Sequence, residues 1–444
     1  MKHILIIGSG ARECMIIKTL KKGPEKIKIS CIGSHRNPYI DKHSFLYISD
    51  INSKTIKILL LIIGKIDFVF IGPETPLKEG VSNYLESKGI PCIGPMQYYA
   101  QIETSKIFAR NFIDSINLSQ YSPNYIVVND IVTNTNNKLN EFVISNKEIV
   151  IKNDGLCGGK GVFVQGIDFN TLDEVKSVLS HYPILIEEKL EGEEFTLMSI
   201  TDGHGGIRHF PPIQDYKRLN DDDLGPNTGS MGCLIFKNNS LPFLNDTELL
   251  EAQTINSKVI NELNNSGKKQ GYFIGYRGIL YGSYIKTANG LKIIEFNSRF
   301  GDPEGIIALN LLENNFLDIC EEIVCGNLTS QLTFSQKASL GIYMVPKTYP
   351  QPSLEKYDIY IDPKLNTKNI IFGDVEKKDA HLYTRSSRSL FYFVTDNDLL
   401  QCYSKVYQDI QGITGNLRFR TDIGRKYLTQ YDKGGVQLNV EQSY

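Results

Sequence analysis

The chain has 444 residues, of which 48 are Lys or Arg and 50 are Asp or Glu, so its formal net charge is −2. This balance excludes a strongly basic chain, and we expect neither nucleic acid nor a membrane as a partner. The composition, with 41% hydrophobic residues, also excludes a disordered, collagen-like or disulfide-stapled protein, and the length predicts about three domains. The eight cysteines are scattered and suit a reducing compartment, so we expect a cytoplasmic enzyme.

The first part of the chain alternates between strands and helices. Apolar strands are predicted at 3–7, 27–32, 68–71 and 91–93. Helices are predicted directly after the first strand and at 53–63 and 81–88, the last two ending at Gly64 and Gly89. Strands and helices that alternate at this spacing form a doubly wound parallel α/β domain, which we place at residues 1–104.

The central part has a different pattern. A helix is predicted at 101–113, and the strands then come as hairpins: 148–152 with 162–164, and 279–285 with 291–296. Asn289-Gly290, the strongest kind of short hairpin signal, joins the second pair. We therefore expect a central domain with antiparallel sheets at 105–330, including a flap subdomain at about 123–190.

The last part of the chain forms a third predicted unit. Short strands are expected at 339–345, 370–372 and 390–394, followed by a helix at 398–410. This pattern predicts a small C-terminal α+β domain at 331–444. The whole chain is thus expected to be a multidomain protein of the α/β and α+β classes.

A glycine turn, Gly8-Ser9-Gly10-Ala11-Arg12-Glu13, follows the first strand. Such a turn lets the backbone approach a phosphate at the N-terminus of the next helix, where free N–H groups favour an anion. The dinucleotide fingerprint GxGxxG requires a third glycine where this chain has Glu13, and no acid stands about 20 residues further on. We therefore expect a phosphate-bearing substrate here, in preference to NAD or to a turn with a purely structural role.

A second glycine-rich segment runs from Lys152 to Gly161 and contains four glycines and two lysines. Its backbone N–H groups, together with the ammonium groups of Lys152 and Lys160, can surround a polyphosphate. A Walker A loop would open a helix, whereas a strand is predicted here directly after the loop. We therefore expect a hairpin flap over phosphates, the alternative being a solvated surface hairpin.

Glu295, Asn297 and Arg299 stand at every second position near the end of a predicted strand. Side chains two residues apart share one face of a strand, so the carboxylate and the amide project together. These oxygens suit Mg²⁺, which takes its other ligands from water and substrate phosphates, and Arg299 can stabilise a transferring phosphoryl group. The alternative is an exposed edge strand that ends in a turn at Gly301-Asp302-Pro303.

Two further segments are polar. Five carboxylates occur from Glu187 to Glu194, and they form either a solvated face or the linker of a nucleotide cleft whose acid holds ribose hydroxyls. Asp215 to Arg218 and Gly225 to Gly232 form a glycine-rich stretch that is either a binding loop or a connector. Its Pro-Asn-Thr-Gly turn favours the ordered binding loop.

Taken together and in this order, these segments resemble the motifs of the ATP-grasp ligases, and most closely those of the phosphoribosylamine–glycine ligase (glycinamide ribonucleotide synthetase) family. The family motifs GSGGREH, KADGLAAGKGV, GPNTGGMG and EFNxRFGDPE are similar to the segments that begin at Gly8, Lys152, Gly225 and Glu295. Other blocks that resemble the family are Ile71 to Leu77, Ile93 to Pro95, Glu103 to Lys106 and Arg420 to Gly424. The resemblance spans the whole chain and implies a pre-ATP-grasp N-terminal domain, an ATP-grasp core and a C-terminal cap.

The resemblance also implies an ATP-dependent ligase of purine biosynthesis that joins glycine to 5-phosphoribosylamine through a glycyl phosphate. It implies Mg²⁺ or Mn²⁺ on Glu295 and Asn297, with Arg299 and Lys160 as catalytic residues. The implied ATP-binding residues are Lys106, Lys152, Gly155, Gly158, Gly159, Lys160, Glu187, Glu188 and Glu194. The implied residues for the other two substrates are Gly8, Ser9, Gly10, Arg12, Glu13, Asp215, Lys217, Asn227 and Asp302. These small molecules are the expected partners, and we expect a monomer.

The chain departs from the family pattern around the substrate loops. Ala11 and Ser230 replace glycines, Cys14 and Tyr216 replace histidines, and Ser386-Ser387 replaces a glycine pair. A side chain where a backbone approaches closely can alter the acceptor pocket. Two alternatives therefore stay open: a divergent ATP-grasp ligase with another acid or amine, and a catalytically silent nucleotide-binding homologue.

Overall fold

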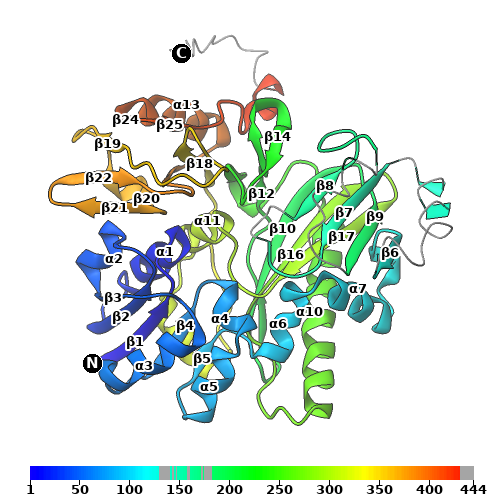
Figure 1. The fold of residues 1–444 in the computed structure, drawn as a ribbon, viewed down its shortest axis with the longest axis horizontal. Coiled ribbons are helices and arrows are strands. Elements are labelled where there is room, and N and C mark those ends of the chain that lie inside the picture. The colour runs from blue at the N-terminus through cyan, green and yellow to red at the C-terminus, as the bar shows by residue number, and fades with distance from the viewer. Residues whose placement is uncertain are drawn as a thin grey trace.

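The computed structural model describes residues 1–129, 141–142, 145–146, 148–157, 161–171, 174 and 183–430. In Figure 1 the N-terminal sheet lies at the lower left, the strands of the central part at the right, and the C-terminal strands at the upper left. The three groups of elements surround the centre of the molecule, where the candidate site lies.

The N-terminal residues form a parallel sheet in the order β3-β2-β1-β4-β5. Its strands are β1 (Lys2–Ile7), β2 (Ile27–Gly33), β3 (Phe45–Ile48), β4 (Phe68–Ile71) and β5 (Cys92–Ile93), and its helices are α1 (Ala11–Leu20), α2 (Pro38–His43), α3 (Ser53–Ile63), α4 (Glu74–Lys78) and α5 (Val81–Ser87). The chain runs outward from the central β1 in both directions, which is the doubly wound order. The sequence pattern does not reveal the edge strand β3, because Phe45 and Ile48 are exposed and leave no buried run.

The helix predicted at 101–113 is in fact two helices, α6 (Gln97–Thr104) and α7 (Lys106–Ser115). The chain is extended at Ser105, with φ −142° and ψ 114°, and the Ser105 hydroxyl accepts a hydrogen bond from the Phe108 N–H at 3.0 Å. A serine in this position satisfies a free N–H group and starts a new helix. Glu103, near the end of α6, and Lys106, the first residue of α7, both line the central cavity.

Two antiparallel sheets form most of the central part, and both expected hairpins are present in them. One sheet has the order β6-β9-β7-β8 and the other β11-β10-β16-β17, with a separate hairpin β13-β14. The strands are β6 (Tyr125–Val128), β7 (Ile149–Asn153), β8 (Val162–Val164), β9 (Ile184–Glu188), β10 (Glu193–Asp202), β11 (Ile207–His209), β13 (Arg218–Asn220), β14 (Leu224–Asn227), β16 (Arg277–Thr287) and β17 (Gly290–Asn297). The register between β16 and β17 shifts after Ser283, which pairs with Glu295, while Tyr284 pairs with Ile293.

A further sheet joins strands from both sides of residue 330, in the order β12-β15-β18-β23-β20, with β25 also pairing with β18. Its strands are β12 (Gln214–Asp215), β15 (Gly232–Ile235), β18 (Ala338–Pro346), β20 (Ile370–Phe372), β23 (Leu390–Asp396) and β25 (Leu417–Arg418). A small sheet beside it has the order β21-β22-β19-β24, formed by β19 (Asp358–Ile361), β21 (Val375–Lys378), β22 (His381–Thr384) and β24 (Ile413–Gly415). The β15–β18 pairing therefore connects the C-terminal residues to the centre of the chain.

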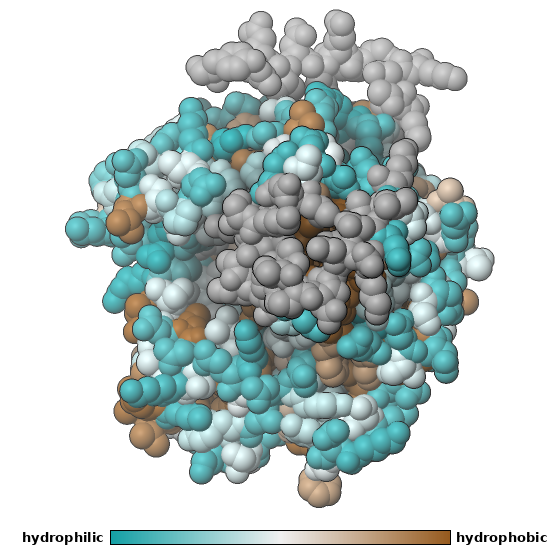
Figure 2. Space-filling model, turned by 45° about the vertical axis from the view of Figure 1, so that its right-hand side comes forward, coloured by the Kyte–Doolittle hydropathy of each residue, from teal (hydrophilic) through white to brown (hydrophobic). Residues whose placement is uncertain are grey.

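The remaining helices pack around these sheets. They are α10 (Asp246–Lys269), α11 (Glu304–Leu311), α12 (Phe316–Cys325), α13 (Leu399–Asp409) and the short 3₁₀ helices η1 (Ser119–Tyr121), η2 (Asp221–Asp223), η3 (Lys237–Asn239), η4 (Thr367–Asn369), η5 (Ile410–Gly412) and η6 (Arg425–Gln430). The described residues contain no helix that is both long and apolar enough to cross a membrane. Hydrophilic residues make up most of the coloured surface in Figure 2, and hydrophobic ones occur in small groups. The expected fold class, a parallel α/β sheet followed by antiparallel and α+β parts, is confirmed.

Candidate functional site

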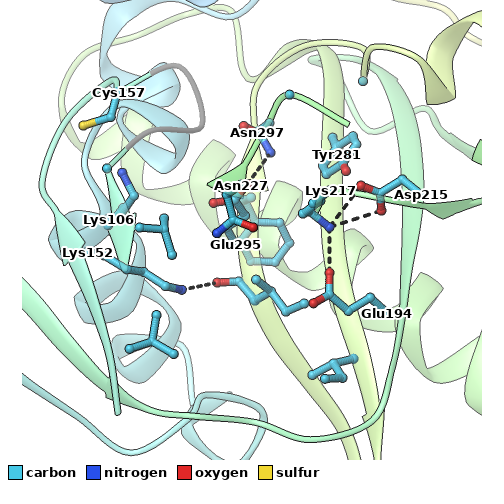
Figure 3. Close-up of a pocket in the computed structure, with 18 of the residues that line it drawn as sticks. Lys106, Lys152, Cys157, Glu194, Asp215, Lys217, Asn227, Tyr281, Glu295 and Asn297 are labelled. Carbon is cyan, nitrogen blue, oxygen red and sulfur yellow. Dashed lines mark hydrogen bonds and ion pairs between the residues drawn. The ribbon is translucent and has the colours of Figure 1, made fainter. Parts of the chain in front are cut away.

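A cavity of about 730 Å³ lies where the three groups of elements meet. Its walls come from β7, β8 and β9, from β10, β16 and β17, from α7, and from the loop after β4. Figure 3 labels ten of the lining residues. This volume is within the range of small-molecule sites. The predicted site residues that line it are Arg12, Lys106, Lys152, Gly155, Glu187, Glu188, Glu194, Asp215, Lys217, Asn227, Glu295, Asn297, Arg299 and Asp302.

The first glycine turn contributes only Arg12 to this lining, and Gly8, Ser9, Gly10 and Glu13 lie beside it in the turn. The Glu13 carboxylate accepts hydrogen bonds from the Gly10 N–H and from Arg12 Nε, each at 2.7 Å. Glu13 therefore caps α1 itself, where a third glycine would have left N–H groups free for a phosphate. The turn thus serves to orient the Arg12 guanidinium.

The flap loop contributes Lys152 and Gly155, whereas Gly158, Gly159 and Lys160 lie outside the described residues. The Lys106 ammonium group donates a hydrogen bond to the Gly155 carbonyl at 2.9 Å. Asp154 accepts hydrogen bonds from the Ser105 hydroxyl and from the Ile107 N–H. The first turn of α7 therefore holds the near end of the glycine loop.

Glu187, Arg110 and Lys152 form a buried ion-pair cluster next to the flap loop. Glu187 lies 2.5 Å from Arg110 Nε and 2.6 Å from Lys152 Nζ, and all three side chains are almost fully buried. Burial alone would raise the pKa of Glu187, but the two cations lower it below its ordinary value. Arg110 also donates to the carbonyls of Ile293 and Ile294, where β17 bulges. The cluster thus fixes Lys152 and the strand that carries Glu295.

Glu295 and Asn297 share a face of β17, and the Asn297 amide donates to Glu295 Oε1 at 3.3 Å (Figure 3). Burial alone would raise the pKa of Glu295, but Lys152, Lys106 and Lys217 lower it, so the carboxylate is ionised. Among the described residues, no cluster of three or more His, Cys, Asp or Glu side chains could hold a metal by itself. One carboxylate and one amide oxygen fit a hard cation that takes its other ligands from phosphates and water.

Arg299 lies at the rim of this pair. Its Nη2 is 3.0 Å from Glu103 Oε1, and its Nε is 3.4 Å from Glu74 Oε2 without forming a hydrogen bond to the described residues. Burial alone would lower the pKa of Arg299, but these two carboxylates raise it. The guanidinium is therefore permanently charged and held at the cavity wall by two carboxylates.

Lys217 connects two predicted groups of residues at the other end of the cavity. Its ammonium group lies 2.7 Å from Glu194 and 3.1 Å from Asp215 (Figure 3). Burial raises the pKa of Asp215, while Lys217 opposes this effect. Glu194, which the resemblance assigns to ATP, thus contacts a lysine that it assigns to the other substrates.

Asp302 is held by the C-terminal part of the chain. Tyr343 donates a hydrogen bond to Asp302 Oδ1, and Arg388 Nη2 lies 3.2 Å from its other oxygen. Arg388 also donates to the carbonyls of Gly229 and Ser230 and lines the cavity. The loop before β23 therefore reaches the site and supports the glycine-rich loop of Gly225 to Gly232.

The structure gives local explanations for three departures. Cys14 is buried, and burial raises the pKa of its thiol to about 12, so it cannot take over acid–base work from a histidine. The Tyr216 ring is covered by the Arg420 guanidinium at 5.1 Å. Ser230 has a φ of 90°, a conformation that favours glycine, and its hydroxyl donates to the Gly232 carbonyl. Ser386 and Ser387 are exposed.

Several lining residues escaped the sequence reasoning: Glu74, Glu103, Arg110, Tyr281, Glu304 and Arg388. Glu74, Glu103 and Glu304 stand in segments that resemble family blocks, so a signal for them was present. Arg110 has partners 77 and 184 residues away, and Arg388 has partners 86 and 159 residues away. No local pattern indicates such contacts.

Comparison with known proteins agrees with this geometry. The family model described as phosphoribosylglycinamide synthetase, N domain, matches residues 2–103, and the model of its ATP-grasp (A) domain matches residues 104–305. The phosphoribosylamine–glycine ligase of Methanocella arvoryzae is 34% identical over 431 residues, covering 96% of each chain. That of Methanococcus maripaludis is 35% identical over 436 residues, covering 95% of this chain and 96% of its own.

Solved structures show the same fold. The phosphoribosylamine–glycine ligase from Thermotoga maritima matches with a TM-score of 0.76 at 23% identity, over 95% of this chain and 99% of its own. The N5-carboxyaminoimidazole ribonucleotide synthetase from Thermotoga maritima matches with a TM-score of 0.63 at 14% identity, over 94% of this chain and 99% of its own. The family resemblance seen in the sequence motifs is confirmed, and the chain belongs to the phosphoribosylamine–glycine ligase family of ATP-dependent ligases.

Proposed function

We propose that this chain uses ATP to join glycine to 5-phosphoribosylamine, giving glycinamide ribonucleotide, ADP and phosphate in purine biosynthesis. One observation carries the proposal: a single cavity brings the lysines of α7 and the flap, the Glu295–Asn297 pair and Arg299 together with Asp215 and Lys217. The first set suits a triphosphate and its transferred phosphoryl group. The second set suits small polar substrates that must meet that phosphoryl group.

The ATP end is assigned to the flap side of the cavity. Lys106 and Lys152 would neutralise phosphate charge, and Gly155, together with Gly158 to Lys160 of the same loop, would approach the phosphates through backbone N–H groups. Apolar side chains of Val150, Leu185 and Ile294 line the cavity near Lys152 and suit an adenine ring. Glu188 would hold the nucleoside, while Glu187 acts by fixing Lys152.

ATP-grasp enzymes use ATP with a divalent metal ion, and we propose Mg²⁺ or Mn²⁺ here, held by Glu295 and Asn297. Such an ion would supply positive charge beside the phosphate oxygens. The three lysines that keep Glu295 ionised also leave it ready to bind a cation without first losing a proton. No further protein ligand is needed where substrate phosphates complete the coordination.

The transfer itself is a matter of position and charge. A glycine carboxylate oxygen attacks the γ-phosphoryl group, the bond to the ADP oxygen breaks, and glycyl phosphate forms. Arg299, with Lys160 of the flap, would stabilise the charge on the transferring group. Glu74 and Glu103 hold the Arg299 guanidinium in place before substrate arrives.

The other two substrates are assigned to the opposite end. Arg12, oriented by the turn of Gly8, Ser9, Gly10 and Glu13, would bind an anionic group. Asp215 is suited to the glycine ammonium group, and Lys217 to an oxygen. Asn227 and Asp302 complete the pocket, with Asp302 acting partly through Arg388.

We also propose that the protein is a monomer and that its three domains meet at residues 104 and 330. We place it in the cytosol, where its eight free cysteines would stay reduced.

The test is an assay of the purified chain with ATP, Mg²⁺, glycine and phosphoribosylamine, in which ADP, phosphate and the amide product are measured. Formation of all three, dependent on both glycine and the amine, is the expected result. ADP release with only another acid or amine would support the divergent ligase instead. Background ADP release with every substrate would support the silent homologue, although that reading does not explain the retained Glu295, Asn297 and Arg299.

A further inference from the structure

Glu304 is a buried acid of the cavity that the proposed roles leave unused. It is the first residue of α11, it is 3% exposed, and it lines the cavity. Its Oε2 passes over Gly301, where a Cβ atom would lie only 2.5 Å from this oxygen. Gly301 also lines the cavity, so its missing side chain leaves room for the Glu304 carboxyl group at the cavity wall.

A hydrogen-bond relay fixes the other oxygen of this group. The Thr196 hydroxyl donates to the Tyr281 hydroxyl at 2.8 Å, and the Tyr281 hydroxyl donates to Glu304 Oε1 at 2.7 Å. Thr196 and Tyr281 are buried and stand on neighbouring strands, β10 and β16. The relay orients the carboxyl group through Oε1. Neither Tyr281 nor Thr196 donates a hydrogen bond to Oε2.

The other carboxylates of the cavity wall are already engaged. Those in ion pairs are Glu74 and Glu103 with Arg299, Glu187 with Arg110 and Lys152, Glu193 with Lys426, Glu194 and Asp215 with Lys217, Asp223 with Arg420, and Asp302 with Arg388. Glu188 accepts two hydrogen bonds from Asn124, and Glu295 is assigned to the metal. Within the described part of the chain, Glu304 forms no ion pair, and the cavity lining includes no histidine.

The surroundings of Glu304 move the pKa of its carboxyl group close to neutral pH. Burial and the nearby Asp215 raise its pKa to about 7, while its own backbone N–H, Tyr281 and Lys217 oppose the rise. The titratable and charged groups that face it are Asp215 and Lys217 on and after β12, Cys233 on β15, Tyr281 on β16, Arg299 after β17 and Arg388 before β23. On α1, which packs against α11, Arg12 and Glu13 pair with each other. An acid of this kind can accept a proton at neutral pH.

We propose that Glu304 is the general base of amide formation, an inference that rests on the proposed function. The amine nitrogen attacks the carbonyl carbon of glycyl phosphate and forms the C–N bond. The bond from this carbon to the phosphate oxygen breaks, and its electron pair leaves with phosphate. The proton that the nitrogen loses goes to Oε2 of Glu304. Tyr281 is a positioning residue that acts through Glu304.

The experiment compares two acceptors for the acyl phosphate in wild type, Glu304→Gln and the control Glu313→Gln. Hydroxylamine captures acyl phosphates without a general base, because its adduct loses a proton readily to water. We expect Glu304→Gln to lose about 100-fold in amide formation with phosphoribosylamine, but less than about threefold in glycine hydroxamate formation. Glu313 is exposed beyond the end of α11, so its variant should match wild type in both assays.

The pH dependence of amide formation is a second test of Glu304 as the general base. The rate of amide formation by wild type should fall as the pH drops through about 7, because the base becomes protonated. Tyr281→Phe removes a donor that favours the charged carboxylate, so it should raise the pKa of Glu304 and move this fall to higher pH. A thermal unfolding scan with and without ATP checks that both variants fold.

Each outcome decides one question. Equal losses in amide and hydroxamate formation by Glu304→Gln would place the residue before the acyl phosphate and overturn the proposal, as would wild-type rates with both acceptors. An unmoved acidic limb in Tyr281→Phe would also overturn it. If wild type itself releases no ADP with glycine and either acceptor, the proposed function fails, a result distinct from a defect confined to Glu304→Gln.

Discussion

At the scale of single residues, the site depends on lysines and carboxylates that balance one another's charge at the cavity wall. Glu295 is half-buried near Lys106, Lys152 and Lys217, which lower its pKa and keep it ionised. Lys152 forms an ion pair with Glu187, and Lys217 forms ion pairs with Glu194 and Asp215. The charges of Lys152 and Lys217 are therefore neutralised by carboxylates other than Glu295. The Glu295 carboxylate can then bind a cation without leaving these lysines unpaired.

The first prediction concerns Glu295→Ala. We expect ATP-dependent turnover to fall by at least about 100-fold, because the variant lacks the charged metal ligand. The melting temperature should move by less than about 5 °C, since Lys152 keeps its pair with Glu187. Steady-state assays over a Mg²⁺ titration and a thermal scan measure both effects, with Glu313→Ala as the control. Wild-type activity in Glu295→Ala would remove the metal assignment.

Cys14 gives a second prediction at this scale. Its thiol has a pKa of about 12 because it is buried, so it is uncharged at pH 8 and poorly nucleophilic. Cys325 is exposed. In the native protein, iodoacetamide at pH 8 should modify Cys325 within minutes and spare Cys14 until the chain is unfolded in urea. Peptide mass spectrometry resolves the two sites, and fast native labelling of Cys14 would contradict its burial.

At the scale of elements, the break between α6 and α7 links a helix cap to the flap loop. The chain is extended at Ser105, and the first turn of α7 contacts the flap loop through Lys106, which donates to the Gly155 carbonyl, and the Ile107 N–H, which donates to Asp154. The Ser105 hydroxyl accepts from the Phe108 N–H and donates to Asp154, which anchors the loop. One side chain thus both caps the helix and positions a phosphate-binding loop.

The third prediction follows from this double role. Ser105→Ala should lower the free energy of unfolding by about 1 kcal/mol through the lost cap and should also raise the KM for ATP several-fold. Asn52 caps α3 in the same way, with its side chain accepting from the Thr55 N–H, but lies away from the cavity. Asn52→Ala should therefore cost similar stability in urea denaturation and leave the KM for ATP unchanged. Equal KM values in all three proteins would contradict the link between cap and loop.

Elements and site residues differ in how well the sequence predicts them. Buried runs such as β1 and the Asn-Gly hairpin are predicted because burial and turn geometry leave a local mark. The edge strand β3 and the break at Ser105 are not, since one faces solvent and the other depends on contact with a loop near residue 154. Motif residues identify the cavity, but Arg110 and Arg388 come from contacts between distant segments.

At the scale of the whole molecule, the C-terminal residues share a sheet with the centre of the chain. β18 pairs with β15 over Gly232 to Ile235, and every residue of both strands is buried. Arg388, from the same part of the chain, reaches the cavity and holds Asp302. On the other side, Asn37 of the N-terminal part donates to the Phe372 carbonyl at 2.7 Å. The three parts therefore share contacts that should couple their stability.

The fourth prediction tests this coupling with a fragment of residues 1–330. Removal of β18 would expose the edge of β15 with its buried Cys233, Leu234 and Ile235, a surface that favours aggregation. We expect the fragment to lack a cooperative urea transition and to form oligomers in light scattering, while the full chain unfolds in one step. Co-expression of 331–444 as a second chain should restore solubility and ATP-dependent thermal stabilisation, because the β15–β18 pairing can form between two chains. A monomeric fragment with a cooperative transition would show that the centre folds without its C-terminal strands.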